Sequence, residues 1–129
     1  MPRRIEADPT TLKVGERLRE LRLERNMSLA ELADVADLSK GHLSSVEHGL
    51  AAITIETISR LAKGLGVPSL YLLTFPGEDE RDQVAELIRK LPAPDLAKLK
   101  RELTKIAKDA AKEAAKEAAK SAKLMRARP

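Results

Sequence analysis

Signals for helix starts recur at short intervals along this chain, and they constrain its fold more than any other feature. Ser28 and Glu31 have capping-box spacing, while Ser39 and Thr54 precede apolar runs as expected for helix caps. Gly49 is placed to end the helix that Ser39 begins. No run of residues has a strand pattern, so the sequence predicts an all-α fold built from short helices.

Five short helices are expected before residue 76. The first begins at Pro9 and ends near Asn26, a residue that tolerates the left-handed conformation found just past helix ends. Two more span 28–36 and 39–47, a fourth follows Thr54, and Pro68 opens the fifth. The residues expected to face inward are Val14, Leu18 and Leu21; Leu29 or Leu32, with Ala33 and Ala36; Leu43 and Val46; and Ile55, Ile58, Leu61, Ala62 and Leu65.

Composition limits the core and the compartment. Tyr71 and Phe75 are the two aromatic residues, and tryptophan and cysteine are absent. An aliphatic core of this kind favours helix packing, and without cysteine neither disulfides nor thiolate metal sites can form. No apolar run approaches the roughly 20 residues of a membrane span, and residues 1–10 have no signal-peptide pattern. We therefore expect a soluble, cytoplasmic protein.

The segment "TFPGEDE" at 74–80 is the clearest break in the chain. It separates a first domain at 10–75 from a helical hairpin at 76–110. A flexible arm at 1–9 is expected before the first domain, and a Lys/Ala-rich tail at 111–129 after the hairpin. The hairpin combines one amphipathic helix with the start of a long final helix, whose apolar residues follow a heptad pattern. It is predicted to pair two chains, with packing on its own domain as the alternative, through Val84, Leu87, Ile88, Leu91, Leu96, Leu99, Leu103 and Ile106.

Positive charge is concentrated near the C-terminus. Residues 96–129 hold eleven lysines and arginines against four acidic residues, whereas residues 1–95 hold thirteen against sixteen. The tail has two equal interpretations: a solvated helix with weak ion pairs, or a segment attracted to DNA phosphates. It also resembles the alanine-lysine spacers of engineered fusions, so its origin stays open.

The helices at 28–36 and 39–47, joined by "DLS", form the candidate functional element. On a helical wheel, Leu43 and Val46 define the buried side of the second helix. Small or polar residues occupy its other side and flanks. A helix with so little bulk on its outer face can enter a DNA major groove about 12 Å wide. Gly41, Ser44, Ser45 and His48 are expected to point outward, with Lys40 and His42 on the two flanks.

Residues 14–73 resemble the Cro/C1-type (XRE) family of phage-repressor helix-turn-helix domains. The resemblance rests on "VGERLRELR", "MSLAELADVADLSKGHLSSVEHG" and "TIETISRLAKGLGVPSLYLL". It implies a five-helix domain in which helix 39–47 reads bases and helix 28–36 crosses the phosphate backbone. The predicted DNA-binding residues are Ser28, Leu29, Ser39, Lys40, Gly41, His42, Ser44, Ser45 and His48.

Two positions depart from the family pattern. Leu29 stands where many members have a polar side chain, so only backbone N–H groups can bind a phosphate there. Gly41 has no side chain at a usual base-reading position, which leaves room for DNA shape to contribute specificity. Arg22 and Glu47 match a structural ion pair that joins the first and third helices in relatives.

No catalytic arrangement, metal site or cofactor is predicted. His42 and His48 are six residues apart and lack a surrounding carboxylate cluster, and Ser44 and Ser45 lack a partner base. The favoured function is a non-enzymatic, homodimeric repressor that binds a partly palindromic operator in double-stranded DNA. The alternatives are an antitoxin-type autorepressor with a toxin docked on 79–110, an adaptor that kept only the fold, and a nucleoid-like architectural protein.

Overall fold

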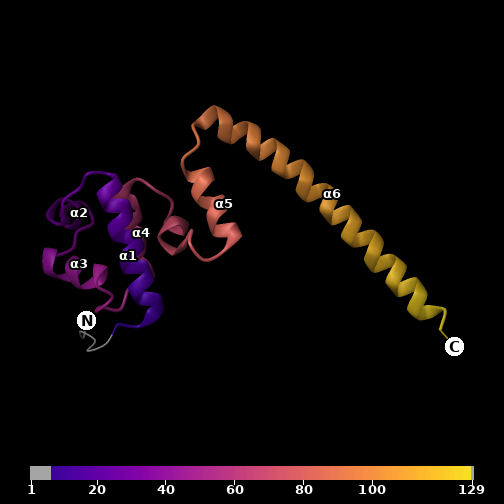
Figure 1. Ribbon diagram of the computed structural model, residues 1–129, viewed down its shortest axis with the longest axis horizontal. Helices are drawn as coiled ribbons and strands as arrows, with labels where there is room; N and C mark the ends of the chain where they lie inside the picture. Colours follow the sequence, from indigo (N-terminus) through magenta and orange to yellow (C-terminus); the bar gives the residue numbers. More distant parts are fainter. Residues whose placement is uncertain (1–6, 129) are drawn as a thin grey trace. The chain divides into compact units, whose positions relative to one another are not determined.

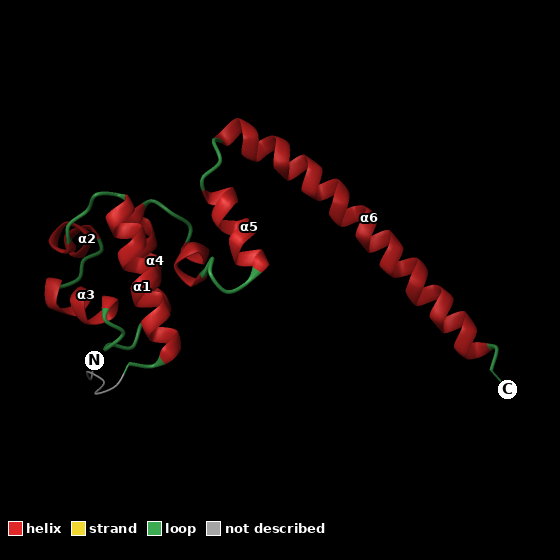
Figure 2. Ribbon diagram, viewed as in Figure 1, coloured by secondary structure: helices red, strands yellow, loops and turns green. Residues whose placement is uncertain are grey.

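The structure is a computed structural model that describes residues 7–128, and its fold is all-α as predicted (Figures 1 and 2). Contacts divide the chain into two compact units, Met1–Leu87 and Ile88–Pro129. The helices are α1 (Pro9–Glu24), α2 (Leu29–Val35), α3 (Lys40–Glu47), α4 (Ile55–Leu65), the 3-10 helix η1 (Ser69–Leu73), α5 (Glu80–Arg89) and α6 (Ala93–Arg126).

Local capping explains where the helices of the first unit begin. The side chains of Ser28, Ser39 and Thr54 each accept a hydrogen bond from the backbone N–H three residues ahead, at 3.0–3.1 Å. Asp8 accepts from the N–H groups of Thr10 and Thr11 and so caps α1. These bonds satisfy N–H groups that a helix terminus leaves unpaired.

The turns also follow local chemistry. Asn26 has a φ of 55° directly after α1, as its place in the sequence predicted. Gly49 ends the α3 segment with a φ of 72°, and Gly66 ends α4 with a φ of 70°. The predicted arm at 1–9 falls mostly on residues 1–6, which lie outside the described residues.

The core of the first unit is aliphatic. α1 packs against α3 and η1, and α2 packs against α3 and α4. Each of these elements contributes at least one leucine that is almost completely buried. These are Leu18, Leu21, Leu32, Leu43, Leu61, Leu65 and Leu72. Aliphatic side chains from these short helices therefore fill the core, and neither Tyr71 nor Phe75 is among its fully buried residues.

Two details differ from the predictions. Ile55 was expected to face inward but is 87% exposed, because the first turn of α4 buries Thr57 instead. Thr57 accepts a hydrogen bond from the Thr54 hydroxyl at 2.9 Å, so the capping contacts set the orientation of this turn. The fifth helix, which follows Pro68, is a 3-10 helix.

In the second unit, α6 is a single helix of 34 residues. Pro94 lies in its first turn, a position that proline tolerates because its missing N–H would have no partner there. The predicted seam and the Lys/Ala-rich tail therefore belong to one continuous helix. Glu113 and Lys116 form an exposed ion pair at 3.6 Å, one of those expected along the tail.

Candidate nucleic-acid interface

The N-terminal half of α3 is open to solvent. Lys40 and Gly41 are exposed, and a Cβ atom added to Gly41 would have no atom within 4 Å. On the opposite side of the helix, Leu43 and Val46 are fully buried. The two buried residues anchor α3 to the core while its outer surface stays slim enough to approach another molecule closely.

The remaining predicted residues of α3 are less uniform. His42, Ser44 and Ser45 are half-buried, and His48 is exposed at the C-terminal end. The Nδ1 atom of His48 lies 2.6 Å from the Ser44 carbonyl oxygen, which restrains the ring over the last turn. Ser44 is only partly outward-facing, because it lines a hollow of about 400 Å³ together with residues of α1 and α2.

At the start of α2, Ser28 is exposed and its side chain is engaged in capping. Leu29 is half-buried and packs against the core cluster. Its side chain therefore contributes to folding, and only its backbone could meet a phosphate. Ser39 is exposed and caps α3 through the N–H of His42.

The structure brings the predicted structural pair together. The Nε atom of Arg22 donates to Oε1 of Glu47 at 2.8 Å, and the same guanidinium donates to the Met27 carbonyl at 2.9 Å. The Glu47 side chain is 4% exposed and that of Arg22 is 11% exposed. The pair therefore links the C-terminal end of α3 to α1.

Gly15 is a structural residue that the sequence analysis did not single out. A Cβ atom at this position would lie 2.5 Å from the carbonyl oxygens of Val46 and Glu47. α1 and α3 therefore cross with their backbones in close contact, which only glycine permits here. An isolated glycine inside a helical pattern is the available sequence signal for such a crossing.

The comparisons with known proteins agree with this geometry. A family model described as "Helix-turn-helix" matches residues 18–72. The control protein C.BamHI of Bacillus amyloliquefaciens is 35% identical over 65 residues, which are 50% of this chain and 80% of that protein. The chain belongs to the Cro/C1-type (XRE) helix-turn-helix family. The family consists of transcriptional regulators, which are not enzymes.

Two further relatives show how far the likeness extends. The transcriptional regulator RamB of Mycobacterium tuberculosis is 35% identical over 74 residues, or 57% of this chain, but these span only 15% of RamB's own length. The crystal structure of the hypothetical transcription factor NHTF from Neisseria has 29% identity and a TM-score of 0.51. It covers 54% of this chain and 79% of that chain. The shared region is the helix-turn-helix domain.

Outside that shared domain of this helix-turn-helix protein, many of the residues predicted for dimerisation are exposed to solvent. Val84 and Leu87 of α5 are 46% and 67% exposed. In the second unit, Leu103 and Ile106 are 43% and 62% exposed. A shallow groove there is lined by Ile88, Leu96, Leu99, Lys100, Leu103, Thr104 and Ala107.

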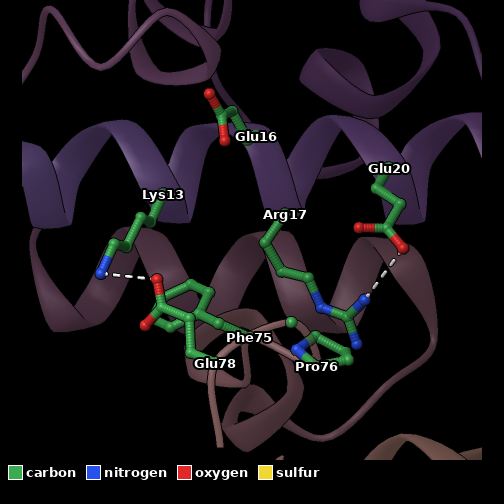
Figure 3. Close-up of a pocket in the computed structure, with 8 residues that line it drawn as sticks. Lys13, Glu16, Arg17, Glu20, Phe75, Pro76 and Glu78 are labelled. Carbon is green, nitrogen blue, oxygen red and sulfur yellow. Dashed lines mark hydrogen bonds and ion pairs between the residues drawn. The ribbon is translucent and has the colours of Figure 1, made fainter. Parts of the chain in front are cut away.

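The sequence analysis also missed a cluster around Arg17. Figure 3 shows Arg17 on α1 beside Phe75 and Pro76, with Lys13 reaching Glu78 and Arg17 reaching Glu20. The Arg17 side chain is only 2% exposed, although it carries a full charge. The available signal in the sequence was helical periodicity, which puts Arg17 on the same face of α1 as Val14, Leu18 and Leu21.

Within residues 7–128, no group of three or more His, Asp or Glu residues could hold a metal ion. Among the helices of the same residues, none combines the length and the apolar character needed to cross a membrane.

Proposed function

We propose that this protein is a sequence-specific DNA-binding regulator that acts as a homodimeric repressor on a partly palindromic operator. The observation that carries the proposal is the open N-terminal half of α3, where a Cβ atom added to Gly41 would enter open space and Lys40 is exposed. A helix anchored by buried Leu43 and Val46 can place these residues against base edges in a major groove. The predicted cytoplasmic, nucleoid-associated location follows from this function.

The exposure pattern of α5 supports the homodimer. The half-buried residues of α5 mix the charged Asp82, Glu86 and Arg89 with Ala85 and Ile88, whereas the large apolar side chains of Val84 and Leu87 face solvent. An exposed apolar face of this kind is typical of an interaction surface, and a second copy of the chain would supply the same apolar face to cover it.

Two paired copies would present their α3 helices to half-sites about 34 Å apart, or one turn of DNA. The same uncovered face favours a second candidate, an antitoxin-type autorepressor whose toxin partner docks on residues 79–110. The two candidates share DNA binding and differ in what covers the apolar face of α5 and the groove on α6.

Selection of bound sequences from a random DNA pool tests the proposal. We expect the full chain to enrich a symmetric motif, and a Leu103→Lys variant to dissociate and enrich a weaker half-motif. Leu103 lines the α6 groove, so a lysine there places a charge in the proposed interface. Ala111→Lys, at an exposed position one helical turn beyond the groove, is the matched control and should behave as the full chain.

Each outcome decides one part of the proposal. No enriched motif with the full chain would contradict DNA regulation and favour the adaptor alternative. If the Leu103→Lys variant enriches the same symmetric motif as the full chain, dimerisation does not use the groove on α6. Sedimentation of both variants reports the oligomeric state independently of DNA.

The tail gives a separate prediction about DNA affinity. If the lysines of α6 contact phosphates, changing Lys112, Lys116 and Lys120 to Gln should make the slope of log affinity against log salt shallower by about 2–3, since each phosphate contact contributes about 0.9. All three are exposed. The control is Glu113→Gln with Glu117→Gln, which removes charge from the same segment but keeps every lysine. A slope that stays unchanged in the lysine variant would identify the tail as a solvated helix.

A further inference from the structure

Two arginines of α1, five residues apart, form buried ion pairs with two different helices. Arg22 binds Glu47 of α3, and Arg17 binds Glu86 of α5. Five residues advance about 7.5 Å along a helix and turn roughly 140° around it, so the two arginines leave α1 on different sides. α1 therefore holds the DNA-reading helix on one side and α5 on another.

The Arg17 guanidinium makes three hydrogen bonds, and one of them reaches α5. Its Nε atom donates to the Tyr71 carbonyl at 3.1 Å, one terminal nitrogen donates to Glu20 at 3.3 Å, and the other donates to Glu86. The Glu86 side chain is 13% exposed, whereas that of Glu20 is 65% exposed. A buried, planar guanidinium that binds a backbone carbonyl and the largely buried carboxylate of Glu86 permits little displacement of these two groups.

The segment that leads into α5 is attached to α1 by two further contacts. Lys13 forms an ion pair with Glu78 at 2.7 Å, and its Nζ atom lies 5.9 Å from the centre of the Phe75 ring (Figure 3). The Phe75 N–H donates to Asp82 of α5 at 2.9 Å. α5 has no fully buried residue, and Asp82 and Glu86 link it to Phe75 and to α1.

We propose that the Arg17–Glu86 ion pair sets the distance between the α3 helices of two paired copies, and thereby the half-site spacing that the dimer accepts. The inference rests on the proposed function, because it takes Val84 and Leu87 as part of the surface that meets the second copy. With α5 held by α1, that surface has a fixed position relative to α3 within the first unit. Without the ion pair, α5 can move and the two α3 helices lose their fixed separation.

DNA geometry makes spacing a sensitive measurement. Each base pair inserted between half-sites moves one of them by about 3.4 Å and turns it by about 35°. The full chain should therefore bind its selected operator at least about tenfold more tightly than versions with one base pair added or removed. A Glu86→Ala variant should bind the three operators within about threefold of one another, while its affinity for an isolated half-site stays unchanged.

Glu20→Ala is the matched control, because it removes the other carboxylate of the same arginine without touching α5. It should keep the spacing preference of the full chain. Asp82→Asn is a second test variant, since it weakens the contact with the Phe75 N–H and leaves Arg17 with both carboxylates. It should relax the preference in the same direction as Glu86→Ala, by a smaller factor.

The outcomes separate this inference from the proposed function. If the full chain binds no operator, the proposed function fails. If the full chain prefers one spacing and both Glu86→Ala and Asp82→Asn keep that preference, the inference is overturned. An equal loss of affinity for all three spacings would also overturn it, because a merely structural role would weaken every complex alike.

Discussion

Replacing Gly15 with alanine should lower the free energy of unfolding of the first unit by about 3 kcal/mol, the upper part of the usual range for overpacking. The added Cβ atom would lie 2.5 Å from two carbonyl oxygens and 2.9 Å from the carbonyl carbon of Glu47. All three are backbone atoms, so no side chain can move aside. α1 and α3 must separate, and the loss exceeds the gain in helix propensity of about 1 kcal/mol that alanine brings.

Gly41→Ala is the matched control for this prediction. Gly41 is also a helical glycine, but its Cβ atom would enter open space. The substitution should therefore stabilise the protein by up to about 1 kcal/mol. Fluorescence of Tyr71, the single tyrosine, reports unfolding of the first unit during urea denaturation. Equal stability of the two variants would show that α1 and α3 do not need their close approach.

The second large effect is expected from Glu47→Ala, which should cost about 3–5 kcal/mol because it leaves a buried arginine without its carboxylate. Arg22 would keep its bond to the Met27 carbonyl at 2.9 Å, but its charge would lose the Glu47 carboxylate. The melting temperature of this variant should fall, while its preferred DNA sequence should stay the same. Thermal denaturation and the sequence selection described above check the two properties separately.

Glu56→Ala provides the control for the loss of an ion pair as such. Glu56 binds Arg60 at 2.7 Å, but the two side chains are 73% and 43% exposed. Removing this surface pair should change stability by less than about 1 kcal/mol. If Glu47→Ala leaves melting unchanged and abolishes DNA binding, the Arg22–Glu47 pair belongs to the DNA interface and the structural interpretation is wrong.

The local features of the first unit could be predicted because each depends on residues close in sequence. The caps at Ser28, Ser39 and Thr54 act on N–H groups three residues away. The left-handed turn at Asn26 and the inward stripe of Leu43 and Val46 are likewise properties of one helix and its ends. Helix positions, the all-α class and the open side of α3 followed from such short-range rules.

The same reasoning was wrong for Ile55 and silent about Gly15. Periodicity placed Ile55 on the apolar stripe of α4, but the first turn buries Thr57, which is held by the capping threonine. For Gly15, the helical pattern of α1 contains no information about which backbone will cross it. That carbonyl oxygens of α3 lie 2.5 Å from its Cβ position depends on the packing of elements about thirty residues apart.

The helices, their caps and the slim outer side of α3 can be predicted from short stretches of sequence, because they depend on hydrogen bonds and periodicity within one or two turns. Which face of α5 turns inward depends on contacts with residues far away along the chain. Spacing places Val84 and Leu87 on one apolar face but leaves open whether that face packs on its own domain or pairs two chains. In the structure both are exposed, while Asp82 and Glu86 bind Phe75 and Arg17. The physical reason is Arg17: its buried charge requires carboxylate partners, and one of them comes from 69 residues away.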